Sequence, residues 1–171
     1  MMTLFLALVI VLCGSVLAYM FTRTEVKENV FTPAEVKCEV VETFDGTNKT
    51  SVKIKNTGNI DAYLRLRLVS YWVDDSGNIV AKPSEMPTVN MASGWVAGTV
   101  DNTYYYVHPV APNAMTDELL ASQITLKTDS EGNRQVLEVF AEAIQSKPVE
   151  AVTSSWGVTM DSDGETIESA P

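Results

Sequence analysis

The longest regular pattern in this chain runs from residue 62 to residue 73 and reads Ala62-Tyr63-Leu64-Arg65-Leu66-Arg67-Leu68-Val69-Ser70-Tyr71-Trp72-Val73. Successive side chains of an extended chain point to opposite faces, so the large apolar side chains here share one face: Leu64, Leu66, Leu68 and Trp72. Arg65 and Arg67 point the other way. The pattern predicts a long β-strand with one face in a hydrophobic core.

Shorter alternating segments lie on both sides of this strand. They are Val36 to Phe44, Ser51 to Lys55, Ile79-Val80, Trp95-Val96, Thr103 to Val107, Gln123 to Lys127 and Gln135 to Ile144. Turn-forming sequences such as Asp45-Gly46-Thr47-Asn48 and Asp129-Ser130-Glu131-Gly132-Asn133 separate several of them and indicate hairpins. Short strands at this spacing predict an all-β fold, an antiparallel β-sandwich of jelly-roll type over residues 34–158.

One helix is predicted, close to the C-terminus. Ser146 is expected to cap it, Pro148 suits its first turn, and Val149 to Trp156 forms its body before Gly157 ends it. Residues 159–171 carry four acidic residues and no basic one. We therefore expect a loosely ordered acidic tail after the domain.

The N-terminal residues, 1–18, have the pattern of a signal peptide or a membrane segment. No charged residue precedes Arg23, the stretch Leu4 to Leu12 is continuously apolar, and Gly14 to Ala18 supplies small residues for a signal peptidase. Cleavage is expected between Ala18 and Tyr19. The alternative is a retained anchor, because about 20 apolar residues suffice to span a bilayer.

Charge and cysteine content agree with export. The chain has 12 basic and 22 acidic residues, a net charge of −10. This charge argues against nucleic acid or an anionic membrane surface as a partner, and leaves the segment before cleavage as the expected membrane contact. Cys13 leaves with the signal peptide, and Cys38 alternates with Val36 and Val40 as a buried strand thiol would.

The residues needed for common enzyme sites are missing. His108 is the one histidine, whereas a hydrolytic zinc ion normally takes at least two histidines or a histidine with cysteines. No Gly-x-Ser-x-Gly motif occurs, and no carboxylate pair stands out among the acids. Asp74 to Asn78 and Asp161 to Glu165 have oxygen ligands for calcium, but a hairpin turn and a solvated tail explain them as well. We predict no catalytic residue, no metal and no cofactor.

Several blocks of sequence, in order along the chain, resemble the TasA/camelysin-type family of exported Firmicute surface proteins. They are Ala18 to Thr22 with Glu28 to Thr32, Lys55 to Arg65, Gly94-Trp95 through Tyr106, and Phe140 to Gln145 with Trp156-Gly157. The resemblance implies a jelly-roll domain on the surface of a Gram-positive cell, released by a dedicated signal peptidase. It also implies members that build pilus-like biofilm-matrix fibres by passing an N-terminal strand to the next subunit. The missing basic leader, the helix and the acidic tail are departures from the family pattern.

The segment after the cleavage site, residues 19–33, fits such a donor strand. It has no turn signal before Pro33, and five of its residues are candidates for assembly contacts: Met20, Phe21, Val26, Val30 and Phe31. Burying four or five apolar side chains at roughly 1.5–3 kcal/mol each gives about 6–15 kcal/mol. Association costs roughly 4–15 kcal/mol, so area alone leaves open whether the segment joins a neighbour's sheet edge or folds back on its own domain.

Two functions remain open at this point. The first is a secreted structural protein that forms a homopolymeric fibre of the biofilm matrix. The alternative is a monomeric cell-surface module that recognises a glycan or a protein through its aromatic residues: Trp72, Trp95, Tyr104, Tyr105 and Tyr106. A fibre subunit should elongate as its concentration rises, whereas a binding module should stay monomeric and lose its ligand when these aromatics are removed.

Overall fold

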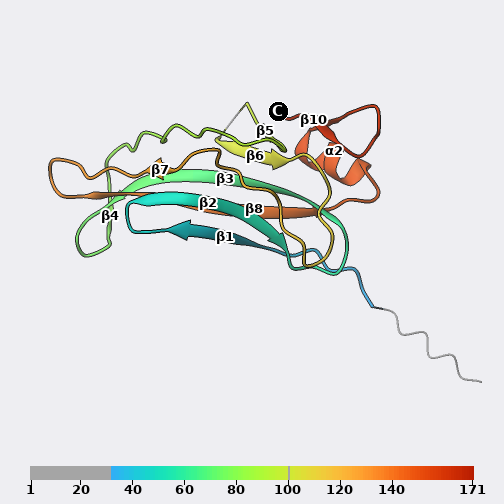
Figure 1. The fold of residues 1–171 in the computed structure, drawn as a ribbon, viewed down its shortest axis with the longest axis horizontal. Coiled ribbons are helices and arrows are strands. Elements are labelled where there is room, and N and C mark those ends of the chain that lie inside the picture. Colours follow the sequence, from blue (N-terminus) through green and yellow to red (C-terminus); the bar gives the residue numbers. More distant parts are fainter. Residues whose placement is uncertain (1–31, 100) are drawn as a thin grey trace, which may run out of the picture. The chain divides into compact units, whose positions relative to one another are not determined.

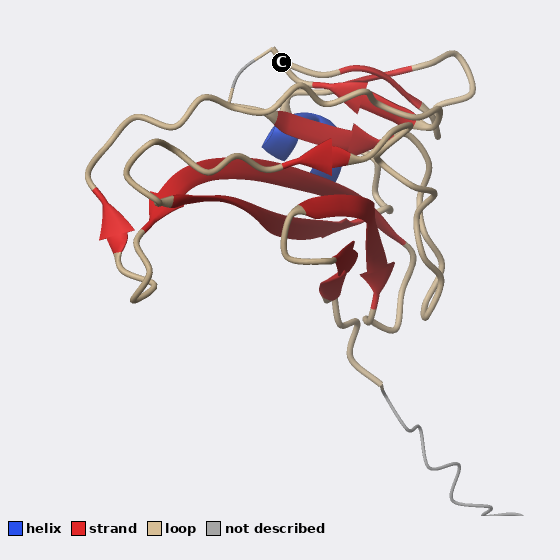
Figure 2. Ribbon diagram, turned by 60° about the vertical axis from the view of Figure 1, so that its left-hand side comes forward, coloured by secondary structure: helices blue, strands red, loops and turns tan. Residues whose placement is uncertain are grey.

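The structure, a computed structural model, describes residues 32–99 and 101–171. The predicted signal segment and the assembly residues up to Phe31 lie outside the described residues. Residues Ala34–Pro171 form one compact unit of antiparallel strands with a short helix (Figures 1 and 2). The predicted all-β fold is confirmed. Within the described part of the chain, no helix has the length and hydropathy needed to cross a bilayer.

The larger sheet has five strands and is organised around β3 (Ala62–Val73). One edge of β3 pairs along its whole length with β8 (Arg134–Gln145), so that Ala62 lies opposite Gln145 and Val73 opposite Arg134. The other edge pairs with β6 (Thr103–Tyr106) and β4 (Ile79–Val80), and β5 (Trp95–Ala97) continues the sheet beyond β6. The alternation in residues 62–73 therefore does mark a central strand.

The smaller sheet contains β1 (Cys38–Phe44), β2 (Asn48–Asn56) and β7 (Ile124–Thr125), in the order β1-β2-β7. The two sheets face each other across one hydrophobic core (Figure 2). We call it the main core; its members include Val52, Ile54, Leu64, Leu66, Leu68, Leu119, Ile124 and Leu137. The inward leucines of β3 are all buried in it, as their spacing predicts.

A second core lies on the opposite face of the larger sheet. Here α2 (Glu150–Trp156), β9 (Thr159–Met160) and β10 (Ile167–Ser169) cover one part of that face. Its buried members are Tyr63, Tyr105, Val152, Trp156, Val158 and Ile167. The expectation of a loosely ordered tail over residues 159–171 is therefore wrong, because Ile167 anchors the β9–β10 hairpin against the sheet.

The helix begins later than its sequence suggests. Val149 is its N-cap and makes no side-chain cap hydrogen bond, so the predicted cap at Ser146 is wrong. The Ser146 backbone N–H instead donates to the Asp61 carbonyl and continues the pairing beside β3. The predicted end is confirmed, because Gly157 adopts the left-handed conformation (φ 67°) that favours glycine.

Candidate functional site

One edge of β8 has no strand hydrogen-bonded to it beyond Gln135 in the described part of the chain. The Gln135 N–H donates to the Lys127 carbonyl, on the side of β8 away from β3. Because backbone groups alternate along a strand, the N–H and C=O groups of Leu137, Val139, Ala141 and Ala143 point to that same side. Beyond Gln135, no described strand pairs with them. This row of backbone groups is the free edge of β8.

A groove lies between the free edge of β8 and β1, the edge strand of the smaller sheet. One hollow, of about 190 Å³, is lined by Glu42, Phe44, Lys49, Leu126 and residues 134–137, together with Gly46. A second, of about 340 Å³, is lined by Val40, Glu42, Tyr71 and residues 136–139. The two hollows share Glu42, Val136 and Leu137 and therefore form one groove beside residues 40–44 of β1 and 134–139 of β8.

A buried lysine stands in the groove. Lys49 is only 3% exposed, its ammonium group lies 2.5 Å from a Glu42 carboxylate oxygen, and it also faces the Phe44 ring. Phe44 itself is 47% exposed. The lysine points inward because the register between β1 and β2 shifts after Thr43, which reverses the alternation at the start of β2. A bulge of this kind leaves no mark in the alternating pattern, so the sequence did not reveal Lys49.

Carboxylates and an exposed ring lie along the outer face of β8. Glu138 and Glu142 flank Phe140, which is 48% exposed. Glu142 accepts hydrogen bonds from the Arg65 guanidinium at 2.9 and 2.6 Å. Burial raises the pKa of the Tyr71 phenol, and the nearby Glu138 carboxylate raises it further. The free edge of β8 is thus bordered by negative charge on its outer side and by the apolar groove on its inner side.

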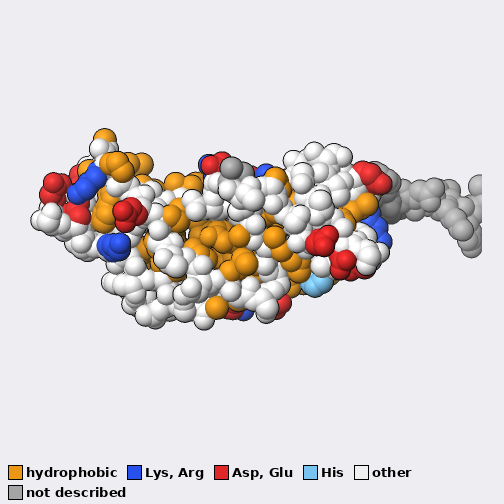
Figure 3. Space-filling view, turned by 90° about the horizontal axis from the view of Figure 1, so that it is seen from above, with side chains coloured by type: hydrophobic (Ala, Val, Ile, Leu, Met, Phe, Trp, Pro, Cys, Tyr) orange, Lys and Arg blue, Asp and Glu red, His pale blue; other side chains and the backbone are white. Residues whose placement is uncertain are grey.

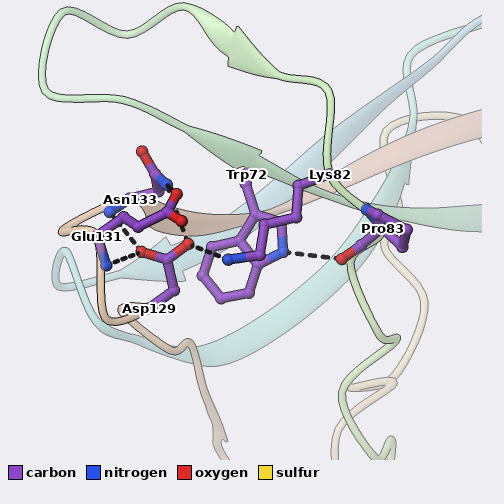
Figure 4. A network of polar contacts seen from close by, with 6 residues as sticks. All are labelled: Trp72, Lys82, Pro83, Asp129, Glu131 and Asn133. Atoms are coloured by element: carbon purple, nitrogen blue, oxygen red, sulfur yellow. Dashed lines mark hydrogen bonds and ion pairs between the residues drawn. The ribbon is translucent and has the colours of Figure 1, made fainter.

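The start of β8 is held in place by a polar network (Figure 4). Asp129, in the turn before β8, accepts a hydrogen bond from Lys82 at 2.8 Å and bonds to the backbone and side chain of Asn133. Lys82 lies over the Trp72 ring, and the Trp72 indole N–H donates to the Pro83 carbonyl at 3.1 Å. These bonds hold the pKa of the Asp129 carboxyl well below its usual range. They fix the hairpin from which the free edge begins.

The chain enters the domain at the opposite end of the sheets. Residues 35–37, just before β1, are bonded to the turn at 57–59: Thr57 N–H and Gly58 N–H donate to the Lys37 carbonyl, and Asn59 N–H donates to the Glu35 carbonyl. The Glu35 N–H donates in return to the Asn59 side chain at 2.7 Å. This end also holds the start of β3 and the end of β8. Residues 35–37 therefore lie at the end of the domain away from Phe44 and Arg134.

The residues predicted for cleavage and assembly are not placed by the structure. Ala18, Tyr19, Met20, Phe21, Val26, Val30 and Phe31 all lie outside the described residues. What sequence reasoning missed is the other half of the site, the free edge of β8. The alternation of residues 135–144 predicts a strand but carries no signal for which of its edges lacks a partner.

The aromatic residues proposed as a glycan platform are inside the protein. Trp72, Trp95, Tyr105 and Tyr106 are buried and Tyr104 is half-buried. Both faces of β6 are covered, because Tyr106 packs edge-on against Trp95 in the main core and Tyr105 against Trp156 in the second core. These side chains cannot stack on a sugar without unfolding the cores.

The face seen from above in Figure 3 shows hydrophobic side chains along its middle, with charged side chains toward its ends. Loop 81–94 crosses this side of the molecule (Figure 1). Met86 and Val89 in this loop are half-buried and pack against the main core. The loop therefore forms part of the covering of the main core.

The candidate metal ligands are engaged in other contacts. His108 follows the end of β6, is exposed, and lies 3.5 Å from the Thr166 hydroxyl. Cys38 is a half-buried free thiol whose pKa is raised by burial and by Glu142. Asp74 accepts hydrogen bonds from Ser76 and Asn78 within its turn, which lowers its pKa. Within residues 32–99 and 101–171, no three His, Cys, Asp or Glu side chains are grouped to hold a metal ion.

Comparisons of the chain with protein-family models, with curated proteins and with solved structures find no match.

Proposed function

We propose that this chain is an exported structural subunit that polymerises by donating residues 19–32 of one copy to the free edge of β8 in the next. The observation that carries the proposal is the groove between β1 and β8, where unpaired backbone groups border a hollow lined by both apolar and charged side chains. An unprotected sheet edge is a template for another strand. Main-chain hydrogen bonds would supply affinity, and the groove would take alternate side chains.

The positions of the two halves of this contact favour an open polymer. The donor segment leaves the domain beside Glu35 and Asn59, and the groove lies toward Phe44 and Arg134, at the other end of the same strands. The donor and acceptor are thus different surfaces, so the contact is heterologous. Repeating such a contact gives a ring or an open filament. Because the donor and acceptor lie at opposite ends of the same strands, successive subunits would follow one another along the strand direction, which favours the filament.

The donor segment is long enough to cover the free edge of β8, which begins beyond Gln135. β8 is 12 residues long, which corresponds to roughly 40 Å of extended chain. The candidate assembly residues begin at Met20 and end at Phe31, which is the same number of positions. Thr32, Pro33 and Ala34 would remain as a short connection to the donor's own domain.

Kinship with TasA/camelysin-type proteins and a jelly-roll arrangement of the sandwich belong to this proposal. So do removal of residues 1–18 by a signal peptidase and a place in a cell-surface biofilm matrix. The sequence resemblance and the apolar N-terminus support them. The proposed role needs no catalytic residue, metal ion or cofactor, and its partner is a second copy of the chain.

The proposal is tested by comparing two chains that begin at Tyr19 and at Pro33. Negative-stain microscopy and sedimentation over a range of concentrations should give fibres from the first and monomers from the second. Excess free peptide 19–32 should shorten the fibres by occupying growing ends, whereas a scrambled peptide should not. Fibres of normal length from the shorter chain would contradict strand donation.

A further inference from the structure

We infer that the donor strand runs antiparallel to β8 in one register, with Lys27 opposite Glu138, Arg23 opposite Glu142 and Glu28 against Lys49. This inference rests on the proposed function. It assigns to Glu138, Glu142 and Lys49 the role of selecting how a second copy of this chain is seated.

The direction follows from where the chain enters the domain. In a head-to-tail fibre, the end of one domain that holds Glu35 meets the end of the next that holds Arg134. Read backwards from Pro33, the donor then passes from the Arg134 end of the neighbour toward its Gln145 end. Its own N-to-C direction is opposite to that of β8, so the pairing is antiparallel.

The choice of inward face follows from the alternation in the donor. Even-numbered positions carry Met20, Thr22, Thr24, Val26, Glu28 and Val30, with a single charge. Odd-numbered positions carry Arg23, Glu25 and Lys27 in the middle of the segment and Phe21 and Phe31 near its two ends. The even face therefore belongs over the groove and the odd face on the outer, solvent side, in line with Glu138, Phe140 and Glu142.

The charges then select the register. Arg23 and Lys27 are four positions apart, and so are Glu142 and Glu138. When Lys27 lies opposite Glu138, Arg23 lies opposite Glu142 and Glu25 lies opposite the exposed Phe140. A slip of two residues either way places Glu25 opposite Glu138 or Glu142, and like charges directly opposite one another destabilise a strand pair.

The same register gives the one inward charge a partner. Glu28 falls opposite Leu137, whose side chain lines the hollow that also contains Lys49. Lys49 is buried and makes its ion pair with Glu42, whose side chain is still 37% exposed. A buried lysine with room beside it for a second carboxylate fits Glu28, and it would penalise an apolar or basic residue at that position.

Cysteine cross-linking tests the register in fibres of the chain that begins at Tyr19, with Cys38→Ser as background. Glu25→Cys with Phe140→Cys should form disulfides between subunits, because opposite residues in such a pair have Cα atoms about 4.5 Å apart. Lys27→Cys with Phe140→Cys is the matched control, since diagonal positions are about 7–8 Å apart. A covalent ladder on a non-reducing gel is expected for the first pair alone. A ladder from the control pair alone would overturn the register while leaving strand donation intact.

Charge reversal gives a second, independent readout. Lys27→Glu and Glu138→Lys should each slow fibre elongation roughly three- to tenfold, and the two changes combined should restore it. Asp75→Lys, on the exposed β3–β4 turn, changes the net charge equally and should have no effect. Glu28→Lys should also slow elongation without altering the folded domain. The register would be refuted if Lys27→Glu, Glu138→Lys and Glu28→Lys all elongate normally while the chain that begins at Pro33 forms no fibres. Fibres from the chain that begins at Pro33 would instead refute the proposed function.

Discussion

Gly58→Ala is a sharp test of how the chain enters the domain. A Cβ atom at position 58 would lie 2.3 Å from the Glu35 carbonyl oxygen and 3.0 Å from the Lys37 nitrogen. Both atoms are backbone, so neither can rotate away. The segment before β1 must therefore move off the turn at 57–59.

The size of the effect follows from the distances. Restoring ordinary contact at about 3.4 Å requires a shift of roughly 1 Å, because the starting distance is 2.3 Å. The hydrogen bonds from residues 57–59 to residues 35–37, now 2.9, 3.2 and 3.0 Å long, would then exceed the limit for a hydrogen bond. Three bonds at about 0.5–1.5 kcal/mol each predict a loss of roughly 2–4 kcal/mol in the free energy of unfolding.

Urea unfolding of Gly58→Ala against the unmodified chain measures this loss. Gly46→Ala is the matched control, because its Cβ would meet nothing within 4 Å and its positive φ (98°) makes it a test of backbone strain alone. The Gly58 variant should keep its main core and its near-ultraviolet spectrum but release the backbone N–H groups of residues 57–59, which donate to the Lys37 and Glu35 carbonyls, to rapid exchange. A free energy of unfolding within about 0.5 kcal/mol of the original, with the amides of residues 57–59 still protected, would refute the reasoning.

Three further predictions concern Arg65, Asp129 and the N-terminus. Arg65→Ala should lower the free energy of unfolding by roughly 1–3 kcal/mol and expose Trp156, because the guanidinium lies 4.7 Å from the centre of that ring and bonds to Glu142. Tryptophan fluorescence during unfolding measures this loss. An unchanged free energy of unfolding would contradict the stabilising role of Arg65. The pKa of Asp129 is lowered first by Lys82 and then by Asn133, so its carboxylate stabilises the fold above the ordinary aspartate pKa of about 4 and stops doing so as the pH falls. Asp129→Asn should therefore make the loss of stability on acidification less steep. An equally steep loss in the variant would contradict this. The proposed removal of residues 1–18 predicts that N-terminal sequencing of a cell-surface extract begins at Tyr19, and recovery of Leu4 to Leu12 would favour the retained anchor.

The strands were predictable wherever one face is buried and the other is polar. β3 was predicted with its observed bounds, because leucines alternate with arginines along it. β7 is shorter than the predicted 123–127, because Leu126 is buried but the chain there no longer pairs as a strand. The alternation of apolar and polar residues indicates which side chains are buried, but a segment with buried side chains need not pair with another strand.

The second core escaped prediction because its sequence is polar on average. Ile167 is an isolated apolar residue among acids and hydroxyls, yet it is buried in the second core together with Val158 and Tyr63. Tyr63 shares a face of β3 with Arg65, so the alternation places it away from the main core. Both faces of the larger sheet are partly covered, so the alternating pattern alone does not show which residues of the outer face are exposed.

The candidate site could be predicted only on the donor side. The apolar segment up to Phe31 is visible in the sequence, whereas the acceptor groove forms between β1 and β8, which are far apart along the chain. Alternation identifies strands but does not say which edges remain without a partner. Lys49 lies in the groove because of a bulge, which the pattern does not encode.

Amide hydrogen exchange along β8 tests strand donation most directly. In the monomer, the N–H groups of Leu137, Val139, Ala141 and Ala143 point to the free edge, whereas those of Glu138, Phe140 and Glu142 face β3. Assembly should slow exchange of the first set by a large factor and leave the second, already protected set as an internal control. Fibres in which the first set exchanges as fast as in the monomer would contradict the account.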